Sequence, residues 1–275
     1  MDVDPKLLVA AGSLVLFWTW ESWRPFFGQR EGRLRHAGRN LLLALLNTLV
    51  LTLGFALILA QVADHGARSG FGLLRGLALP PALALVGTIL LLDAVMYVWH
   101  RANHAVPLLW RFHRTHHSDP HMDVTTATRF HLGEHAGAFL VRLATIYGLG
   151  LELSHVLLYD VLLLVMTQFH HADISLGRLD AWLRVLLVTP DMHKVHHSQV
   201  PAETDSNYGV LFSWWDRLGR SHRTRTDLQA LHFGLRGLGA DRWQSLRGML
   251  ATPFAPLARR TSDSTGSRRK PDTPG

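Results

Sequence analysis

The sequence predicts an all-α integral membrane protein: a bundle of about four transmembrane helices with a histidine-rich helical cap on the cytoplasmic side. Three observations support this fold class, namely long stretches without charge, an uneven distribution of arginine between connecting segments, and histidines spaced to share helix faces. Hydrophobic residues make up 48% of the 275 residues and charged residues only 18%. We expect one domain at 1–258 and a disordered, polar tail at 259–275.

Five apolar stretches are the candidate membrane helices, at 7–20, 41–62, 81–99, 138–150 and 154–169. The first ends among tryptophans and lacks the basic flank and cleavage site of a signal peptide, so we expect an uncleaved helix. The second contains no charge and is long enough to cross a bilayer. The third is interrupted only by Asp93. The last two are short and read as a helical hairpin that dips into or crosses the membrane.

Arginine counts predict the orientation of these helices. The segment 24–40 contains five arginines, whereas 63–79 contains two, so the first segment is expected in the cytoplasm. The third stretch then runs inward, and the hairpin returns to the same side. Topology and contact with anionic lipid explain the net charge of +7, and we do not expect nucleic acid as a partner.

Histidine spacing is the strongest functional signal. Of 18 histidines, nine follow an HxxxH, HxxHH, single His, HxxHH pattern: His100, His104, His113, His116, His117, His171, His193, His196 and His197. Imidazoles at i, i+3 and i+4 share a helix face, and neutral imidazole is the commonest protein ligand of transition metals. Roughly 0.08 HxxHH matches are expected by chance at this histidine frequency, whereas the chain has two. Nine nitrogen ligands exceed the needs of one ion, so the pattern predicts two.

Neutral ligands leave the metal charge uncompensated, so nearby carboxylates are expected to orient them. Asp93 and Asp160 precede His100 and His171 by whole numbers of helical turns. Glu134 is a third candidate. We predict catalytic support from these three carboxylates, with hydrogen bonding between helices as the alternative role for the two aspartates.

The absence of cysteine excludes thiolate metal sites, iron–sulfur clusters and thiol nucleophiles. His131-Leu132-Gly133-Glu134-His135 matches the HxxEH pattern of inverted zincins and raises a zinc membrane metalloprotease as an alternative, although that function leaves nine histidines unexplained. A haem cytochrome fits clustered histidines poorly. His135 and His170 are possible additional ligands. The isolated histidines are expected in solvent or at the interface: His36, His65, His155, His222 and His232.

Residues 80–220 resemble the fatty acid hydroxylase/sterol desaturase superfamily of membrane di-iron oxygenases. The resemblance is carried by Trp99-His100-Arg101, Leu109-Trp110-Arg111-Phe112-His113, His170-His171-Ala172-Asp173, Thr189-Pro190-Asp191-Met192-His193, Asn207-Tyr208-Gly209 and Trp215-Asp216-Arg217. It implies that the nine histidines bind two iron ions and that O₂ is a co-substrate. It also implies hydroxylation or desaturation of a sterol-like, fatty acyl or related membrane lipid. Because no flavin, nicotinamide or haem module is evident, a separate ferredoxin- or cytochrome-type protein is expected to supply electrons.

Three positions depart from the pattern of that superfamily. Leu132 stands where a proline is common, Asp173 where an asparagine is usual, and Gly219 where an aromatic residue is usual. No expected ligand is lost, so these departures concern the substrate more than metal binding. A catalytically inactive relative that binds metal or lipid remains the alternative.

Overall fold

The computed structural model describes residues 5–28, 32–77 and 79–256, so the tail predicted at 259–275 lies outside the described residues. Helices and loops make up the described part, and no β-strand occurs in it apart from one isolated bridge between Leu187 and Phe212. The all-α prediction is therefore confirmed.

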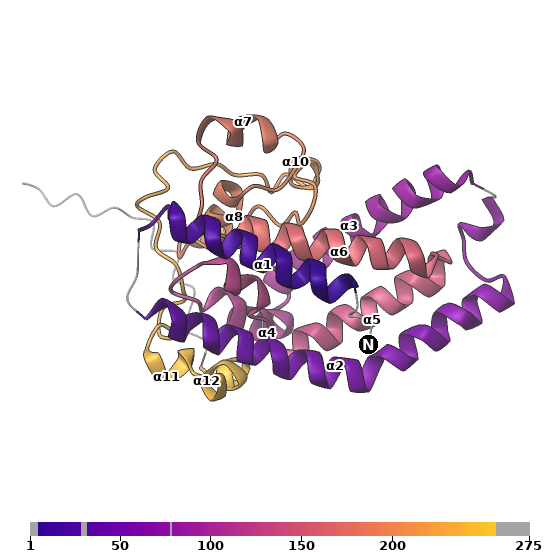
Figure 1. Cartoon of the computed structure of the whole chain (residues 1–275), viewed down its shortest axis with the longest axis horizontal. Helices are drawn as coiled ribbons and strands as arrows, with labels where there is room; N and C mark the ends of the chain where they lie inside the picture. Colours follow the sequence, from indigo (N-terminus) through magenta and orange to yellow (C-terminus); the bar gives the residue numbers. More distant parts are fainter. Residues whose placement is uncertain (1–4, 29–31, 78, 257–275) are drawn as a thin grey trace, which may run out of the picture.

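Five long helices lie along the longest axis of the molecule (Figure 1): α1 (Pro5–Trp23), α2 (Arg33–Ser69), α3 (Pro81–Ala105), α5 (Leu132–Leu149) and α6 (Leu153–His171). A proline occupies the first position of α3, where its missing N–H has no partner to lose. Gly70 and Gly150 end α2 and α5 with positive φ angles of 66° and 71°, which residues with a side chain rarely adopt. Gly150 also makes the sharp turn between α5 and α6, so the predicted hairpin is present.

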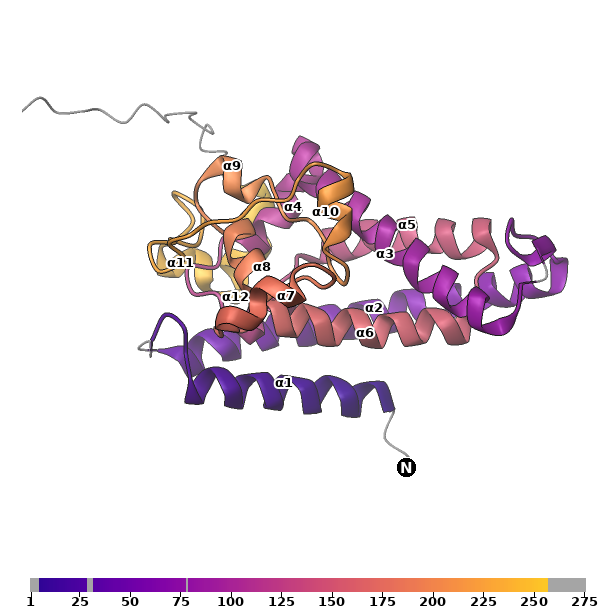
Figure 2. The same ribbon diagram turned by 90° about the horizontal axis from the view of Figure 1, so that it is seen from above.

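Short helices gather at one end of this bundle, as Figures 1 and 2 show. They are α4 (Pro107–His117), α7 (Asp180–Leu183), α8 (Pro190–His196), α9 (Pro201–Thr204), α10 (Trp214–Leu218), α11 (Asp241–Gln244), α12 (Leu246–Ala251), and the 3-10 helices η2 (Val124–Thr128), η3 (Gly177–Leu179) and η4 (Thr252–Phe254). We call this part the cap. A further 3-10 helix, η1 (Arg75–Leu77), lies at the opposite end between α2 and α3.

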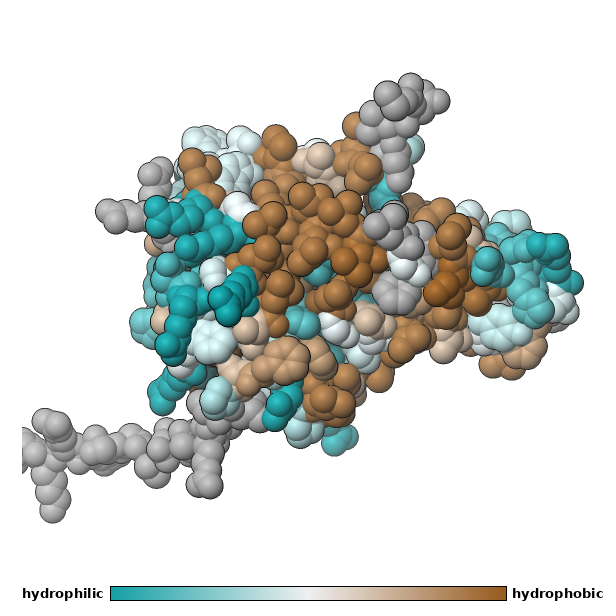
Figure 3. Space-filling model, turned by 90° about the horizontal axis from the view of Figure 1, so that it is seen from below, coloured by the Kyte–Doolittle hydropathy of each residue, from teal (hydrophilic) through white to brown (hydrophobic). Residues whose placement is uncertain are grey.

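Among the described helices, α3 and α6 are long and apolar enough to cross a membrane. Figure 3 shows hydrophobic surface gathered across the middle of one face, with hydrophilic surface toward both ends. Leu83 and Val86 of α3 are more than half exposed in the isolated chain, which is the expected state of side chains that face lipid. The predicted number of four spans is not confirmed beyond these two helices.

A buried apolar cluster aligns the helices that lead to the cap. Leu92 of α3, Ile146 of α5, and Val156 and Tyr159 of α6 pack together, and Leu211 from the cap joins them. This packing brings the C-terminal ends of α3 and α6 to the same end of the bundle. Both ends carry histidines.

Candidate metal centre

The structure brings all nine predicted histidines into two groups whose nitrogen atoms lie within 4.8 Å of one another inside each group. Group 1 consists of His100, His104, His113, His117 and His196; group 2 consists of His116, His171, His193 and His197. The groups adjoin, because the rings of His117 and His197, one from each, stack with centroids 4.5 Å apart. Both groups are buried, with only His100 partly exposed.

Each HxxHH motif contributes to both groups. In α4, His113 and His117 lie one turn apart and join group 1, whereas His116 joins group 2. The motif that begins in α8 reverses this, since its first and last histidines join group 2 and His196 joins group 1. Neighbouring imidazoles on a helix point about 100° apart, so one short motif supplies two adjoining sites.

Close approaches between ring nitrogens fit metal ligation. The Nε2 atom of His171 lies 3.1 Å from that of His116 and 3.0 Å from that of His193. With metal–nitrogen bonds of about 2.1 Å, two ligands at right angles would lie about 3.0 Å apart. The Nε2 atoms of His100 and His196 are buried with no hydrogen-bond partner among the described residues, which is costly unless a metal accepts their lone pairs.

Burial also favours the neutral form of five of these histidines. It is the largest cause that lowers the pKa of His116, His117, His193, His196 and His197 well below the usual value of 6.5, and neighbouring imidazoles lower it further. A neutral imidazole keeps the lone pair that a metal needs, so the centre is able to bind metal.

Partners at Nδ1 fix the orientation of five rings. His113 faces the Glu134 carboxylate at 2.7 Å and His104 faces the Asp205 carboxylate at 3.2 Å. Three other rings face backbone carbonyl oxygens at 2.6–2.9 Å: His100 at Tyr208, His171 at Thr167 and His196 at Ser206. Donation from Nδ1 directs the lone pair of Nε2 toward the centre of the group.

The three predicted carboxylates have different surroundings. Glu134 contacts a histidine ring directly, that of His113. Asp93 instead accepts hydrogen bonds from the cap: from the backbone N–H groups of Leu211 and Phe212 at 3.1 and 3.0 Å, and from the indole of Trp215 at 2.9 Å. It therefore acts on the loop that contains Tyr208 rather than directly on an imidazole.

Asp160 pairs with Arg142 of α5 and, at 3.3 Å, with Lys6 of α1. Sharing a helix face with His171 does not bring it close, because eleven residues of helix span about 16 Å. Asp160 therefore has the alternative role given above, bonding between helices.

Asp205 is a carboxylate that the sequence analysis missed. It had no sequence signal, because it follows a four-residue helix without periodicity and meets His104 only through tertiary packing.

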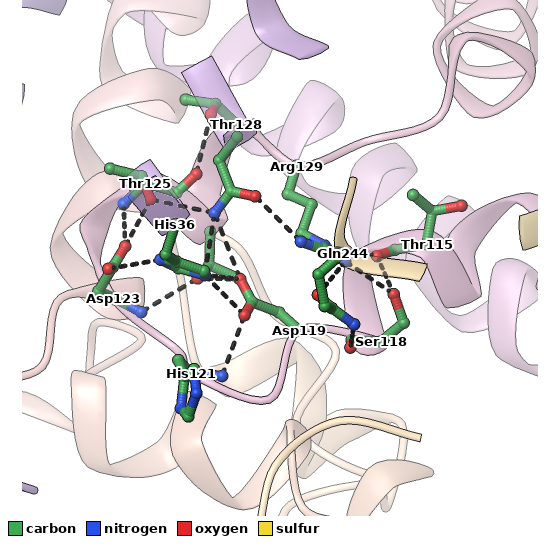
Figure 4. Close-up of polar contacts among 12 residues, drawn as sticks. His36, Thr115, Ser118, Asp119, His121, Asp123, Thr125, Thr128, Arg129 and Gln244 are labelled. Carbon is green, nitrogen blue, oxygen red and sulfur yellow. Dashed lines mark hydrogen bonds and ion pairs between the residues drawn. The ribbon is translucent and has the colours of Figure 1, made fainter. Parts of the chain in front are cut away.

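His36 was expected in solvent or at the interface, but its side chain is only 13% exposed and is not solvated. Figure 4 shows His36 of α2 between two carboxylates of the loop that follows α4, with Nε2 2.8 Å from Asp119 and Nδ1 3.0 Å from Asp123. Asn40, one turn later, donates to the hydroxyl of Thr125 at 3.0 Å and accepts from Arg129 at 3.1 Å. The start of α2 thus fixes the loop next to His116 and His117.

Glu21 of α1 provides a second attachment of this kind. Its carboxylate accepts the backbone N–H groups of Val124 at 3.0 Å and Asp173 at 2.8 Å, and Arg33 pairs with its other oxygen at 2.7 Å. Val124 begins η2, seven residues after His117, and Asp173 lies in the loop that follows His171. The N-terminal helices therefore order the surroundings of both histidine groups.

The ion pair of His36 predicts a pH dependence of stability. Burial lowers the pKa of His36, but the carboxylates of Asp119 and Asp123 outweigh burial and raise it from 6.5 to about 10. Because the pKa is higher in the folded state, the pair stabilises fully below pH 6.5 and loses its effect as the pH rises through about 10. We expect His36→Gln to lower the free energy of unfolding most at the acidic end of this window. Denaturant unfolding of the detergent-purified protein measures it, with His65→Gln on the same helix as control; parallel pH profiles for wild type and His36→Gln would contradict the assignment.

Glu134→Ala is expected to lower metal affinity or turnover by about 10–100-fold, because His113 loses the carboxylate that holds its ring. Glu134→Gln should recover part of the loss, since an amide oxygen still accepts from Nδ1. Metal titration of the purified variants measures the effect, and Glu152→Gln at the exposed hairpin turn is the control. Equal metal affinity in Glu134→Ala and wild type would exclude the positioning role.

The structure does not assemble the alternative zinc-protease site among the described residues. His131 precedes α5, where its Nδ1 accepts from the backbone N–H of Gly133 at 3.0 Å and its Nε2 faces the carbonyl oxygen of Leu250 at 3.2 Å. Glu134 is directed at His113, and neither His131 nor His135 joins a metal-binding group. His170 is buried beside His193, with ring centroids 4.1 Å apart, but also lies outside the two groups.

The three departures from the superfamily pattern have local structural explanations. Leu132 occupies the first position of α5, a position that proline favours but does not require. Asp173 accepts the backbone N–H of Phe27 at 3.2 Å through its carboxylate. At Gly219, a Cβ atom would lie 1.9 Å from the Tyr97 hydroxyl, so that tyrosine fills the space a side chain would need.

Comparison with known proteins agrees with the resemblance found in the sequence. The sequence model of the fatty acid hydroxylase family matches residues 85–221. Ornithine lipid hydroxylase OlsE of Rhizobium tropici is 28% identical over 66% of this chain, and alkylglycerol monooxygenase of Xenopus tropicalis is 33% identical over 48%. The chain covers 53% of the first relative and 28% of the second. The human alkylglycerol monooxygenase is 29% identical over 46% of the chain. No solved structure matches.

Proposed function

Because this chain belongs to the fatty acid hydroxylase family, we propose that it is a membrane-bound, O₂-dependent di-iron hydroxylase of a lipid. The observation that supports this most is the pair of adjoining groups, which together contain nine buried or nearly buried histidines and no other ligand type. A centre of neutral nitrogen ligands suits iron, and two adjoining ions suit a reaction that needs two electrons.

Two iron ions held by groups 1 and 2 would activate O₂ for cleavage of a lipid C–H bond. The balanced reaction converts the C–H bond, O₂, two electrons and two protons into a hydroxyl group and water. The chain's own residues hold the centre rigid: Glu134 and Asp205 orient His113 and His104, and carbonyl oxygens orient three further rings. Burial excludes water from most of the imidazoles and favours the neutral form of those in group 2 such as His116 and His193.

The relatives guide the choice of substrate and reaction. One is named for hydroxylation of ornithine lipid and the other for monooxygenation of alkylglycerol, and both substrates join long hydrocarbon chains to a polar group. We therefore favour hydroxylation over desaturation and a polar membrane lipid as the substrate class. The candidate spans α3 and α6 end in group 1 and group 2 respectively, so both groups lie at the ends of helices that would contact the hydrocarbon chain of a membrane lipid.

Electrons are expected from a separate ferredoxin- or cytochrome-type protein that docks on the cytoplasmic side, which is also the side where the positive-inside rule predicts the cap. Exposed arginines of the cap, such as Arg223 and Arg236, suit an acidic donor. An inactive relative that binds metal and lipid without turnover is the alternative.

Metal analysis followed by single-turnover assay tests this function. The detergent-purified protein should contain about two irons per chain. After chemical reduction, it should transfer one atom of isotopically labelled O₂ into ornithine lipid, an alkylglycerol or a phospholipid. Two irons without any labelled product across these lipids would favour the inactive relative. Zinc in place of iron would contradict the proposal.

A further inference from the structure

One segment of the cap exposes a run of large apolar side chains. Leu179 is 64% exposed, Trp182 80%, Val185 62% and Leu186 49%. These residues belong to η3, α7 and the loop that leads toward α8. Figure 1 shows α7 outside the long helices, on the side of the cap away from α11 and α12. A surface of this kind in water would be an aggregation or binding site, so it needs an occupant.

A chain of hydrogen bonds fixes the position of this segment along the candidate membrane helix α3. The backbone N–H of Ser213 donates to the carbonyl oxygen of Leu186 at 3.1 Å, and that of Val188 donates to Leu211 at 2.9 Å. Leu211, in turn, donates to Asp93, which lies in the middle of α3. These bonds tie the end of the apolar segment to Asp93, while α3 continues past Asp93 to His100 and His104 of group 1. The segment is therefore held next to the half of α3 that leads into the cap, rather than beyond the end of that helix.

The charges around the segment match a lipid surface. Arg178 is exposed at its edge, and Arg217 lies next to it, donating to the carbonyl oxygen of Arg184 at 2.7 Å. Asp180, the one acidic residue within 177–188, is buried and paired with Arg184. The exposed face therefore combines apolar side chains, a tryptophan and arginines, the composition of segments that lie in the boundary between head groups and acyl chains.

We propose that residues 179–186, which we call the interfacial segment, insert into the lipid bilayer on the side of the metal centre. We favour the lipid bilayer over a protein partner at this surface for two reasons. Hydrogen bonds tie the segment to the candidate membrane helix α3, and arginines flank it. Insertion holds the start of α8, and with it His193, at the membrane surface. This inference rests on the placement of α3 and does not depend on the redox chemistry.

Depth measurement with spin labels tests the proposal, and the absence of cysteine in the chain allows single labels without further mutation. Val185→Cys and Leu179→Cys report on the interfacial segment. Val86→Cys on α3 is the control for lipid exposure, and Thr224→Cys on the cap is the control for water exposure. The labelled proteins are reconstituted into vesicles of phosphatidylcholine and phosphatidylglycerol, and collisions with O₂ and with a water-soluble nickel chelate are compared.

The ratio of O₂ to nickel collisions at positions 185 and 179 should be several-fold higher than at 224 and should approach the ratio at 86. A ratio equal to that at 224 would overturn the proposal and place the patch in water, open to a protein partner. Shielding from both reagents would also overturn it, because a second copy of the chain or another part of the protein would then cover the patch. These collision ratios do not depend on enzymatic activity, so a failure to detect lipid hydroxylation would leave this test valid.

Discussion

Alanine at His116 or His117 is expected to abolish turnover, and each substitution should remove metal from a different site. The two side chains are adjacent in α4, yet His116 belongs to group 2 and His117 to group 1. Loss of a ligand should exceed the cost of losing a residue behind a ligand, so we expect activity to fall by more than about 100-fold. Metal content should fall from about two ions to about one in either variant, and to none when both are changed.

Elemental analysis and activity of the purified variants measure this effect. His232→Ala, at an exposed histidine of the cap, should retain both ions and full activity. Insertion into membranes should persist in every variant, because the spans do not depend on the imidazoles. Retention of two irons with unchanged turnover in His116→Ala would exclude its role as a ligand.

Replacement of Asp93 by asparagine is the second change expected to have a large effect. The carboxylate accepts four hydrogen bonds, from the backbone N–H groups of Leu211 and Phe212, the indole of Trp215 and the hydroxyl of Tyr159. An amide turns one acceptor atom into a donor that faces two donors. The stability loss is expected to be roughly 2–6 kcal/mol, because two buried donors lose their acceptor and each unpaired group costs about 1–3 kcal/mol.

Activity should fall more than expression in Asp93→Asn, because the loosened loop contains Tyr208, whose carbonyl oxygen orients His100. Thermal unfolding and turnover of the purified variant measure both effects. Asp160→Asn is a matched control: it also removes a paired carboxylate from a membrane helix, but far from the histidines, and should lower stability while metal content is retained. An unchanged rate in Asp93→Asn would limit this residue to packing between helices.

Much of the candidate metal centre could be predicted from the sequence because the histidine motifs that form it are local. The spacing of His113, His116 and His117 gives their directions on a helix before any tertiary structure is known. The same holds for the long helices, whose apolar stretches exceed what a loop could contain. The apolar pattern does not give the helix boundaries: the charge-free segment 41–62 is shorter than α2, which runs from Arg33 to Ser69 because polar residues extend it at both ends.

Partners from distant parts of the chain could not be predicted. His36 lies 83 residues before Asp119, and no periodic pattern links α2 to the loop after α4. The roles of Asp93 and Asp160 differ for the same reason, since both satisfy the periodicity and only the packing of other segments decides what each one meets.

The sequence by itself thus determined the helical class, the apolar segments and the nine histidines, because helical periodicity and hydropathy act over a few residues. Only the tertiary structure decided the division of those histidines into two groups and the carboxylates that orient them. It also decided the position of the interfacial segment along α3. The physical reason is that burial and hydrogen bonding between distant segments depend on how helices pack, which local spacing does not encode.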